Sequence, residues 1–426
     1  MNETLTFEAK RRRGTLFTGL GAALLAIASA VGCSSTTDSL GDTRERSIAL
    51  GPVKGPLSYP NLFRDLLGKS QSDIDAKIDA AYEQLFHGDP NIEAILRLDG
   101  TDSAIIQDTF HLDQRTEGYG LAMLVAVQLN HRDDFDRIWR GAQRFRFTSG
   151  PSEGYFTSVC DGVNGTETCV DPYGMQQFVM ALIFANDVWK NEPATVDYAS
   201  AATHLLYSMQ HKEDVNGGVV NGVTNAFDAK TKLVPHQPQQ ASANLTRPSL
   251  AMPAYYALWA QATGDDFYLG AAAAARSYLT AVAHNVTGLT PLRSDLSGTP
   301  VRDFDSFQPE SYRVQLNLML DRIWTGQSFP ASSISERLLR FFASQGKDTY
   351  GRSFSLDGSQ VLDLTHEPAL IAANGMSAIA ADAYGDRQSF VEAVWDQPLP
   401  IGTSRYYAGL LHMLALLALG GELQVR

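Results

Sequence analysis

The sequence Asp113-Gln114-Arg115-Thr116-Glu117-Gly118-Tyr119-Gly120 marks the change from a polar loop to a strongly apolar segment. Apolar residues then recur at the spacing of a buried helical face: Leu121, Leu124, Val125 and Leu129. Glu117 therefore belongs to the first turn of a predicted helix, where a carboxylate can cap free N–H groups and suits the helix dipole. The pattern alone leaves two roles open for Glu117, a helix cap or a catalytic carboxylate.

The same alternation of polar loop and apolar helix continues along the chain. Two further sets of apolar residues each fit one helical face: Phe178, Ala181, Leu182, Ala185 and Trp189, and then Tyr407, Leu410, Leu411, Leu414 and Leu417. The Ala-rich run 270–275 favours helix by propensity. Loops rich in Gly, Pro and Asp separate the helices: 149–172, 214–248, 287–309 and 357–368. Because no series of alternating strands is evident, the sequence predicts a mainly α protein, with Trp139, Trp189 and Trp259 in its core.

The composition suits one large globular domain. The chain has 426 residues, of which 44% are hydrophobic and 19% charged, and no linker or charge run interrupts residues 57–426. Its formal net charge of −13 disfavours nucleic acid and acidic lipid surfaces as partners. The sequence contains no CxxC, HExxH, GxGxxG or P-loop motif, so we expect no cofactor or metal. We also expect the protein to be a monomer.

The N-terminus has the features of an export signal. A basic cluster at 10–13 precedes an apolar run at 16–31, and Ala30-Val31-Gly32-Cys33 follows, which resembles a bacterial lipoprotein processing site. Residues 1–32 are then the signal peptide, Cys33 is lipidated, and 33–56 form a flexible tether to the cell envelope. Cleavage at a small residue, with Cys33 unmodified, is the alternative. In an oxidising compartment, Cys160 and Cys169 are expected to form a disulfide across their short polar loop.

Short segments along the chain resemble glycoside hydrolase family 8, in the order of that family. They are Asn61-Leu62-Phe63, Glu83 to Pro90, Ala126 to Leu129, Phe135 to Trp139, Gly154-Tyr155-Phe156, Pro253 to Tyr256, Ser311 to Val314, Leu356-Asp357-Gly358 and Arg405 to Leu411. The most similar branch contains the reducing-end xylose-releasing exo-oligoxylanases. The resemblance implies an (α/α)6 barrel of twelve helices over residues 57–426. It also implies inverting hydrolysis of β-1,4-linked oligosaccharides, with xylo-oligosaccharides as the expected substrate and Glu117 as the general acid.

The rest of the implied catalytic machinery departs from the family. Arg247 stands where the resemblance places the base, in Thr246-Arg247-Pro248-Ser249-Leu250, and a guanidinium cannot accept a proton from water. Tyr173 matches the Asp of a PDG-like segment, Thr224 a water-holding Tyr, and Ser158 a stacking Trp. Asp171, two residues before Tyr173, is our first candidate for the base. The other candidates are Asp228, Asp295, Asp303 and Asp305.

Several polar and aromatic residues are candidates for binding sugar. Arg115 can orient a neighbouring carboxylate, and Arg313 can anchor a carboxylate or a sugar hydroxyl. The other candidates in this group are Tyr119, Tyr173, Arg247, Tyr255, Tyr312 and His366, although a Tyr at helical spacing also suits a core. Two hypotheses follow: a lipid-anchored glycoside hydrolase, or a glycan-binding lipoprotein with weakened or lost hydrolysis. An endo-acting cellulase or chitosanase is a third possibility within the enzyme class.

Overall fold

The computed structural model describes residues 50–159, 168–190, 192 and 196–426, which belong to one compact unit. The predicted signal peptide, the lipidation site Cys33, most of the tether and Cys160 lie outside the described residues. None of the helices in the described ranges has both the length and the apolar character that crossing a bilayer requires.

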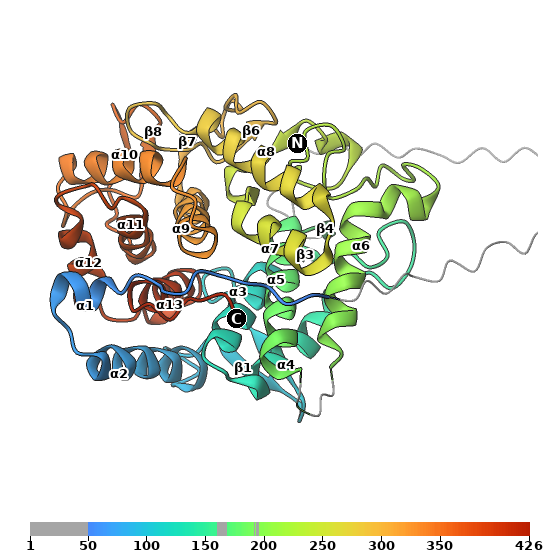
Figure 1. The fold of residues 1–426 in the computed structure, drawn as a ribbon, viewed down its shortest axis with the longest axis horizontal. Coiled ribbons are helices and arrows are strands. Elements are labelled where there is room, and N and C mark those ends of the chain that lie inside the picture. The colour runs from blue at the N-terminus through green and yellow to red at the C-terminus, as the bar shows by residue number, and fades with distance from the viewer. Residues whose placement is uncertain (1–49, 160–167, 191, 193–195) are drawn as a thin grey trace, which may run out of the picture. The chain divides into compact units, whose positions relative to one another are not determined.

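Six helices form a closed inner ring (Figure 1). They are α3 (Thr116–Gln128), α5 (Pro172–Trp189), α7 (Pro253–Thr263), α9 (Arg313–Thr325), α11 (Pro368–Ala380) and α13 (Tyr407–Leu419). Each inner helix packs against the next one in this order, and α13 packs against α3. The ring therefore joins segments from both ends of the described chain.

Six outer helices cover this ring. They are α2 (Gln71–Tyr82), α4 (Arg132–Ala142), α6 (Tyr198–Asn216), α8 (Asp266–Val282), α10 (Ala331–Ser344) and α12 (Arg387–Asp396). The outer helices α4, α6, α8, α10 and α12 each contact the inner helix that precedes them in the chain, and α2 contacts α13. The short helix α1 (Leu62–Leu67) packs on α12. The fold is mainly α, as the sequence pattern predicted, and is the (α/α)6 barrel of twelve helices that the resemblance implied.

Burial differs between the two rings. In α13 every residue from Ala408 to Leu419 is buried, and in α5 every residue from Pro172 to Ala185. Burial therefore extends beyond the single faces that the apolar spacing indicated, because an inner helix is enclosed by the ring and by its outer partner. The outer helix α4 does bury one face, with Phe135, Ile138 and Trp139. Trp189 and Trp259 are also buried, as expected.

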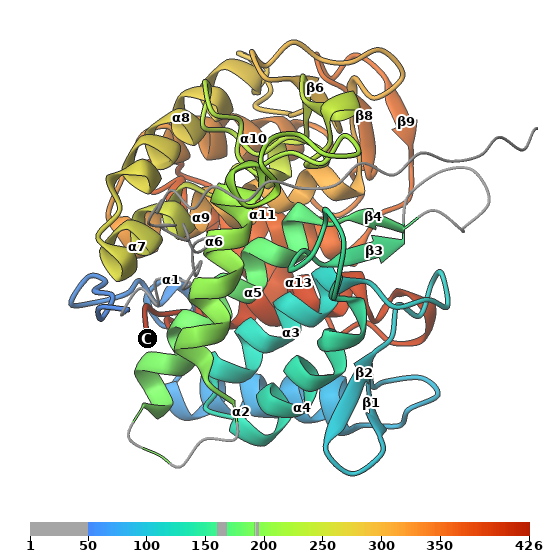
Figure 2. The same cartoon turned by 90° about the vertical axis from the view of Figure 1, so that its right-hand side faces the viewer.

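Short antiparallel strands lie in the connections that lead into the inner helices (Figure 2). The pairs are β1 (Leu96–Asp99) with β2 (Ser103–Ile106), β3 (Thr157–Val159) with β4 (Thr168–Val170), and β5 (Leu245–Thr246) with β6 (Ser294–Asp295). A three-stranded sheet contains β7 (Ser306–Phe307), β8 (Ser353–Ser355) and β9 (Val361–Asp363). Because β2, β4, β5, β7 and β9 each precede an inner helix, these connections converge where the inner helices begin.

Candidate active site

Charged side chains gather where the inner helices begin. Arg115 and Asp171 are the N-cap residues of α3 and α5, and Glu367 is the N-cap of α11. Arg247 precedes the 3-10 turn η4 (Pro248–Leu250) before α7, and Glu310 lies in the 3-10 turn η5 (Pro309–Tyr312) before α9. Helix N-termini carry partial positive charge, so this end of the barrel favours carboxylates and other anions.

Proline sets the local conformation of three of these charged residues. Asp171, Arg247 and Glu367 each precede a Pro that opens a helix or a 3-10 turn, and their φ values are −104°, −114° and −107°. A residue before Pro is restricted to extended conformations, and Pro is well accommodated at the first helical position. The chain thus leaves each loop extended at a charged residue and turns into the helix immediately after it.

Two adjoining cavities form one cleft at this end of the barrel. The first has a volume of about 280 Å³ and is lined by residues that include Asp171, His236, Arg247 and Arg293. The second, of about 380 Å³, is lined by residues that include Phe110, Arg313, Glu367, Tyr406 and Tyr407. Arg115, Glu117 and Glu310 line both. The two carboxylates therefore lie where the cavities meet.

Glu117 lies in the first turn of α3 as the sequence predicted, and an arginine holds it. The buried Arg313 guanidinium lies 2.9 Å from Glu117 Oε2 and stacks near the rings of Tyr173 and Tyr407, at 4.4 and 5.2 Å from the ring centroids. Burial raises the pKa of Glu117, Arg313 opposes this, and the carboxylates of Asp171 and Glu310 raise it further. The net direction is upward, which favours a protonated side chain.

The glycine after Glu117 allows α3 to approach α13 closely. A Cβ atom at Gly118 would collide with the ring of Tyr406, the residue before α13. This side chain also lines the second cavity. The Glu-Gly pair in the opening motif thus combines a site carboxylate with the small residue that the helix contact requires.

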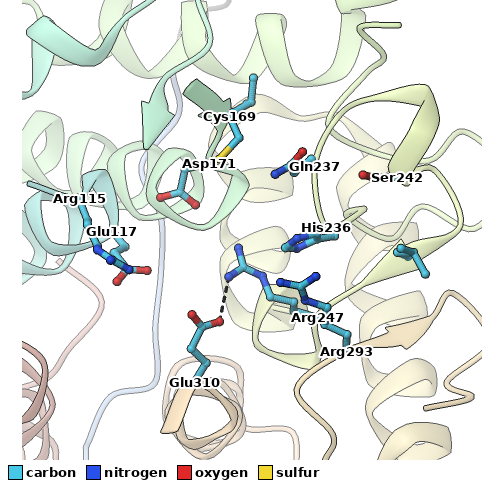
Figure 3. Close-up of a pocket in the computed structure, with 12 residues that line it drawn as sticks. Arg115, Glu117, Cys169, Asp171, His236, Gln237, Ser242, Arg247, Arg293 and Glu310 are labelled. Atoms are coloured by element: carbon cyan, nitrogen blue, oxygen red, sulfur yellow. Dashed lines mark hydrogen bonds and ion pairs between the residues drawn. The ribbon is translucent and has the colours of Figure 1, made fainter. Parts of the chain in front are cut away.

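Glu310 is a second site carboxylate, and its environment is the opposite of that of Glu117. Arg247 Nη1 donates to Glu310 Oε2 at 2.9 Å, and Figure 3 shows the two side chains pointing toward each other across the cavity. Burial disfavours the Glu310 carboxylate, but Arg247, Arg313 and His236 outweigh it and lower its pKa to about 2. Glu310 is therefore ionised over the whole range in which Glu117 takes up or loses its proton.

Asp171 also faces the first cavity, with both of its oxygens bound by protein groups. Its Oδ2 accepts the Thr116 hydroxyl at 2.8 Å, and its Oδ1 accepts the Tyr173 N–H at 3.0 Å as the cap of α5. Figure 3 shows Glu117, Asp171 and Glu310 approaching the same space from different sides. The structure thus places the predicted base candidate in the cleft, in a position that also serves as a helix cap.

Arg247 and His236 give the first cavity a distinct electrostatic character. Burial and the charges of Arg247 and Arg293 lower the pKa of His236 to about 3, so its imidazole is neutral near pH 7. Arg293 stacks on Phe304, with 4.0 Å between the guanidinium carbon and the ring centroid. Of the predicted binding residues, Arg115, Arg247 and Arg313 line the cleft.

The other predicted binding residues lie outside the cavity walls. Tyr173 is fully buried beneath Arg313, while the hydroxyls of Tyr119 and Tyr255 donate to Gln114 and Gln177. Tyr312 donates to the Arg352 carbonyl at 2.6 Å, and His366 contacts the Tyr350 carbonyl at 2.9 Å through Nδ1. None of the remaining base candidates lines the two cavities: Asp228, Asp295, Asp303 and Asp305.

Glu310 was missed in the sequence, although its neighbours Tyr312 and Arg313 were singled out. The available signal was a charged residue beside a proline at the start of a predicted helix, which Pro309-Glu310 shares with Asp171-Pro172 and Arg247-Pro248.

Cys169 lines the first cavity and is disulfide-bonded. Its predicted partner Cys160 lies outside the described residues, so the pairing remains a prediction. Across the described ranges, no three His, Cys, Asp or Glu side chains are grouped as a metal ion would need.

The chain matches the model of glycosyl hydrolases family 8 over residues 98–421. It is 32% identical to the reducing-end xylose-releasing exo-oligoxylanase of Paenibacillus barcinonensis over 380 residues, which cover 86% of this chain and 97% of that protein. It is 31% identical over 377 residues to an exo-oligoxylanase of the same description from Halalkalibacterium halodurans, covering 86% and 94% of the two chains. The structure of the Paenibacillus barcinonensis enzyme complexed with xylose superposes with a TM-score of 0.79, at 31% identity, and covers 87% of this chain and 99% of that one.

Proposed function

Because this chain belongs to glycosyl hydrolases family 8 and is a glycoside hydrolase, we propose that it cleaves β-1,4-linked xylo-oligosaccharides with inversion of configuration. Two features support the substrate. Two relatives, 32% and 31% identical to this chain, are reducing-end xylose-releasing exo-oligoxylanases, and one solved relative is complexed with xylose. The observation that carries the mechanism is the pair of oppositely tuned carboxylates, Glu117 and Glu310, at the junction of the two cavities.

Glu117 is the general acid in this mechanism. Inverting hydrolysis needs one carboxyl group to protonate the leaving oxygen and a second carboxylate about 6.5–9.5 Å away to activate water. Two site groups whose pKa values are shifted apart are the expected acid and base. The pKa of Glu117 is raised, so this side chain keeps a proton at pH values where an ordinary carboxyl group has lost it.

Glu310 is the base in this mechanism. Its pKa of about 2 keeps it ionised, and Arg247 holds one of its oxygens at 2.9 Å. Arg247 cannot accept a proton from water, but it can fix and charge-stabilise the carboxylate that does. Asp171, whose two oxygens accept hydrogen bonds from Thr116 and Tyr173, has the role of ordering the start of α5 beside the bound sugar.

The stereochemistry of the first product tests this mechanism. Proton NMR during early turnover of xylo-oligosaccharides should show the α-anomer of the newly formed reducing end, because water attacks the face opposite the β-linked leaving group. A β-anomer as the first product would contradict inversion. A glycan-binding protein without hydrolysis, the alternative raised by Arg247, would bind these ligands and release no product.

We also propose that the mature protein is anchored in the bacterial cell envelope through Cys33. The support is the order of a basic cluster, an apolar run and Ala30-Val31-Gly32-Cys33, followed by small polar residues. Mass spectrometry of the mature N-terminus should detect an acylated Cys33. A mature protein that begins elsewhere and carries an unmodified Cys33 thiol would contradict this proposal.

A further inference from the structure

The loop between β2 and α3 carries an exposed aromatic ring into the second cavity. Phe110 lines this cavity together with Glu117 and Glu310, yet 71% of its surface is exposed. A large aromatic side chain costs free energy when it is left in water, and a buried aromatic ring contributes about 150–250 Å² of contact area. Phe110 therefore offers an exposed apolar surface in the same cavity as the two carboxylates.

The loop backbone around Phe110 is held by one buried carboxylate. Asp108 Oδ1 accepts the Phe110 and His111 N–H groups at 2.9 and 3.1 Å. Its Oδ2 lies 2.8 Å from His111 Nδ1 and 3.2 Å from Arg115 Nε. The same side chain thus links the loop to Arg115, the N-cap of α3, two residues before Glu117.

Two further contacts fix the position of this loop. The Thr109 hydroxyl donates to the Thr403 carbonyl at 3.0 Å, which ties the loop to the segment before α13. The rings of His111 and Phe110 pack in a T-shaped arrangement, with 4.9 Å between the ring centroids. Leu112 has a φ of 60°, a conformation that costs a non-glycine residue free energy and persists only where the surroundings enforce it. An exposed ring on such a constrained loop loses little conformational entropy when a ligand covers it.

We propose that Phe110 is a stacking platform for one sugar ring of the oligosaccharide, on the wall of the second cavity. This inference rests on the proposed function, because the ligand is the chain that crosses Glu117 and Glu310. The apolar face of a pyranose ring suits an aromatic face. Phe110 lines the second cavity but not the first, whereas Glu117 and Glu310 line both, so the platform acts only on ligands that extend from the two carboxylates into the second cavity. Phe110 is thus a residue that sets chain-length preference.

The test compares affinity across ligand lengths in a protein that binds without turnover. Calorimetry with the Glu117→Gln protein would measure the Kd of xylo-oligosaccharides from two to six sugars. Adding Phe110→Ala should weaken binding of the longer ligands by about 3–10-fold and leave the shortest unchanged. Adding Phe110→Tyr, which keeps the ring, should restore the affinity.

Leu112→Ala is the matched control. Leu112 lies on the same loop and is 80% exposed, but it does not line the cavity. Equal losses at every length in Phe110→Ala, no loss at any length, or the same length-dependent loss in Leu112→Ala would each overturn the platform. So would a change in oligomeric state of Phe110→Ala without a change in sugar affinity, since the ring would then serve a contact between protein copies.

The failure of the proposed substrate gives a different result. If the Glu117→Gln protein binds no xylo-oligosaccharide, the same series is measured with cello-oligosaccharides, whose rings present a similar apolar face. Length-dependent loss in that series would support the platform and reject xylo-oligosaccharides as the ligand. Absence of binding to both series would overturn the platform together with the proposed function.

Discussion

The cleft contains two arginine–carboxylate pairs with the same spacing and opposite consequences. Arg313 lies 2.9 Å from Glu117, and Arg247 lies 2.9 Å from Glu310. The pKa of Glu117 is nevertheless raised, while that of Glu310 falls to about 2. Contact with one guanidinium does not decide the protonation state of a buried carboxyl group.

The remaining neighbours account for the difference. Besides its burial and Arg313, Glu117 has the carboxylates of Asp171 and Glu310 nearby, and both disfavour a further negative charge. Glu310 has Arg313 in addition to Arg247, and His236 adds a positive charge only at the low pH where its own imidazole is protonated. Burial disfavours ionisation of both carboxyl groups, so the sign of the surrounding charge determines which one stays protonated. One cleft can thus supply an acid and a base from the same type of side chain.

The largest change is expected when the acid is removed. Glu117→Gln keeps the shape of the side chain and removes the transferable proton, so kcat on xylo-oligosaccharides should fall by about 10²–10⁴-fold while binding persists. Steady-state kinetics and calorimetry measure the two effects separately. Unchanged turnover in a folded Glu117→Gln protein would reject Glu117 as the acid.

The next largest change is expected when the partner of Glu310 is removed. Arg247 lowers the pKa of Glu310, so Arg247→Met should move it from about 2 toward the ordinary value of 4.5. Because the base must be ionised, the acidic limb of the kcat/KM profile should move to higher pH. Arg302→Met is the control, since Arg302 is an exposed arginine whose side chain is 94% accessible. An acidic limb that stays in place would separate Arg247 from the function of Glu310.

A smaller change is expected when the partner of Glu117 is removed. Arg313 opposes the raised pKa of Glu117, so Arg313→Met should raise it further and move the basic limb of the kcat/KM profile to higher pH. Thermal unfolding would check that the stack with Tyr173 and Tyr407 tolerates the change. A basic limb that moved to lower pH would contradict the account of this pair.

The helices, and the position of Glu117 at the start of one of them, were predictable from local sequence, whereas the barrel and an acid role for Glu117 were expected only from the resemblance to family 8. Apolar residues at helical spacing identified the helices, and Glu117 follows a polar loop at the start of one of them. Enclosure of α13 on all sides was not predictable from the pattern of Tyr407 to Leu417 alone. It depends on closure of the ring between α13 and α3, which are far apart in the chain.

The second carboxylate was not predictable for a similar reason. The resemblance placed the base at Arg247, and Asp171 was the first candidate because its loop neighbours the site in that family. The hydrogen bond from Arg247 to Glu310 joins residues 63 positions apart. Only the assembled cleft shows that the arginine at the expected base position holds a carboxylate from the turn before the next inner helix.

Turnover of Glu310→Gln and Asp171→Asn, measured side by side on xylo-oligosaccharides at the pH optimum, tests the central claim most directly. Both substitutions remove one negative charge and keep the side-chain shape. The account predicts that Glu310→Gln lowers kcat by about 10²–10⁴-fold, because the attacking water loses its proton acceptor. It predicts a much smaller loss for Asp171→Asn, because the Asn side-chain oxygen can still accept the Tyr173 N–H. Loss of turnover in Asp171→Asn together with near-normal turnover in Glu310→Gln would contradict the account and assign the base to Asp171.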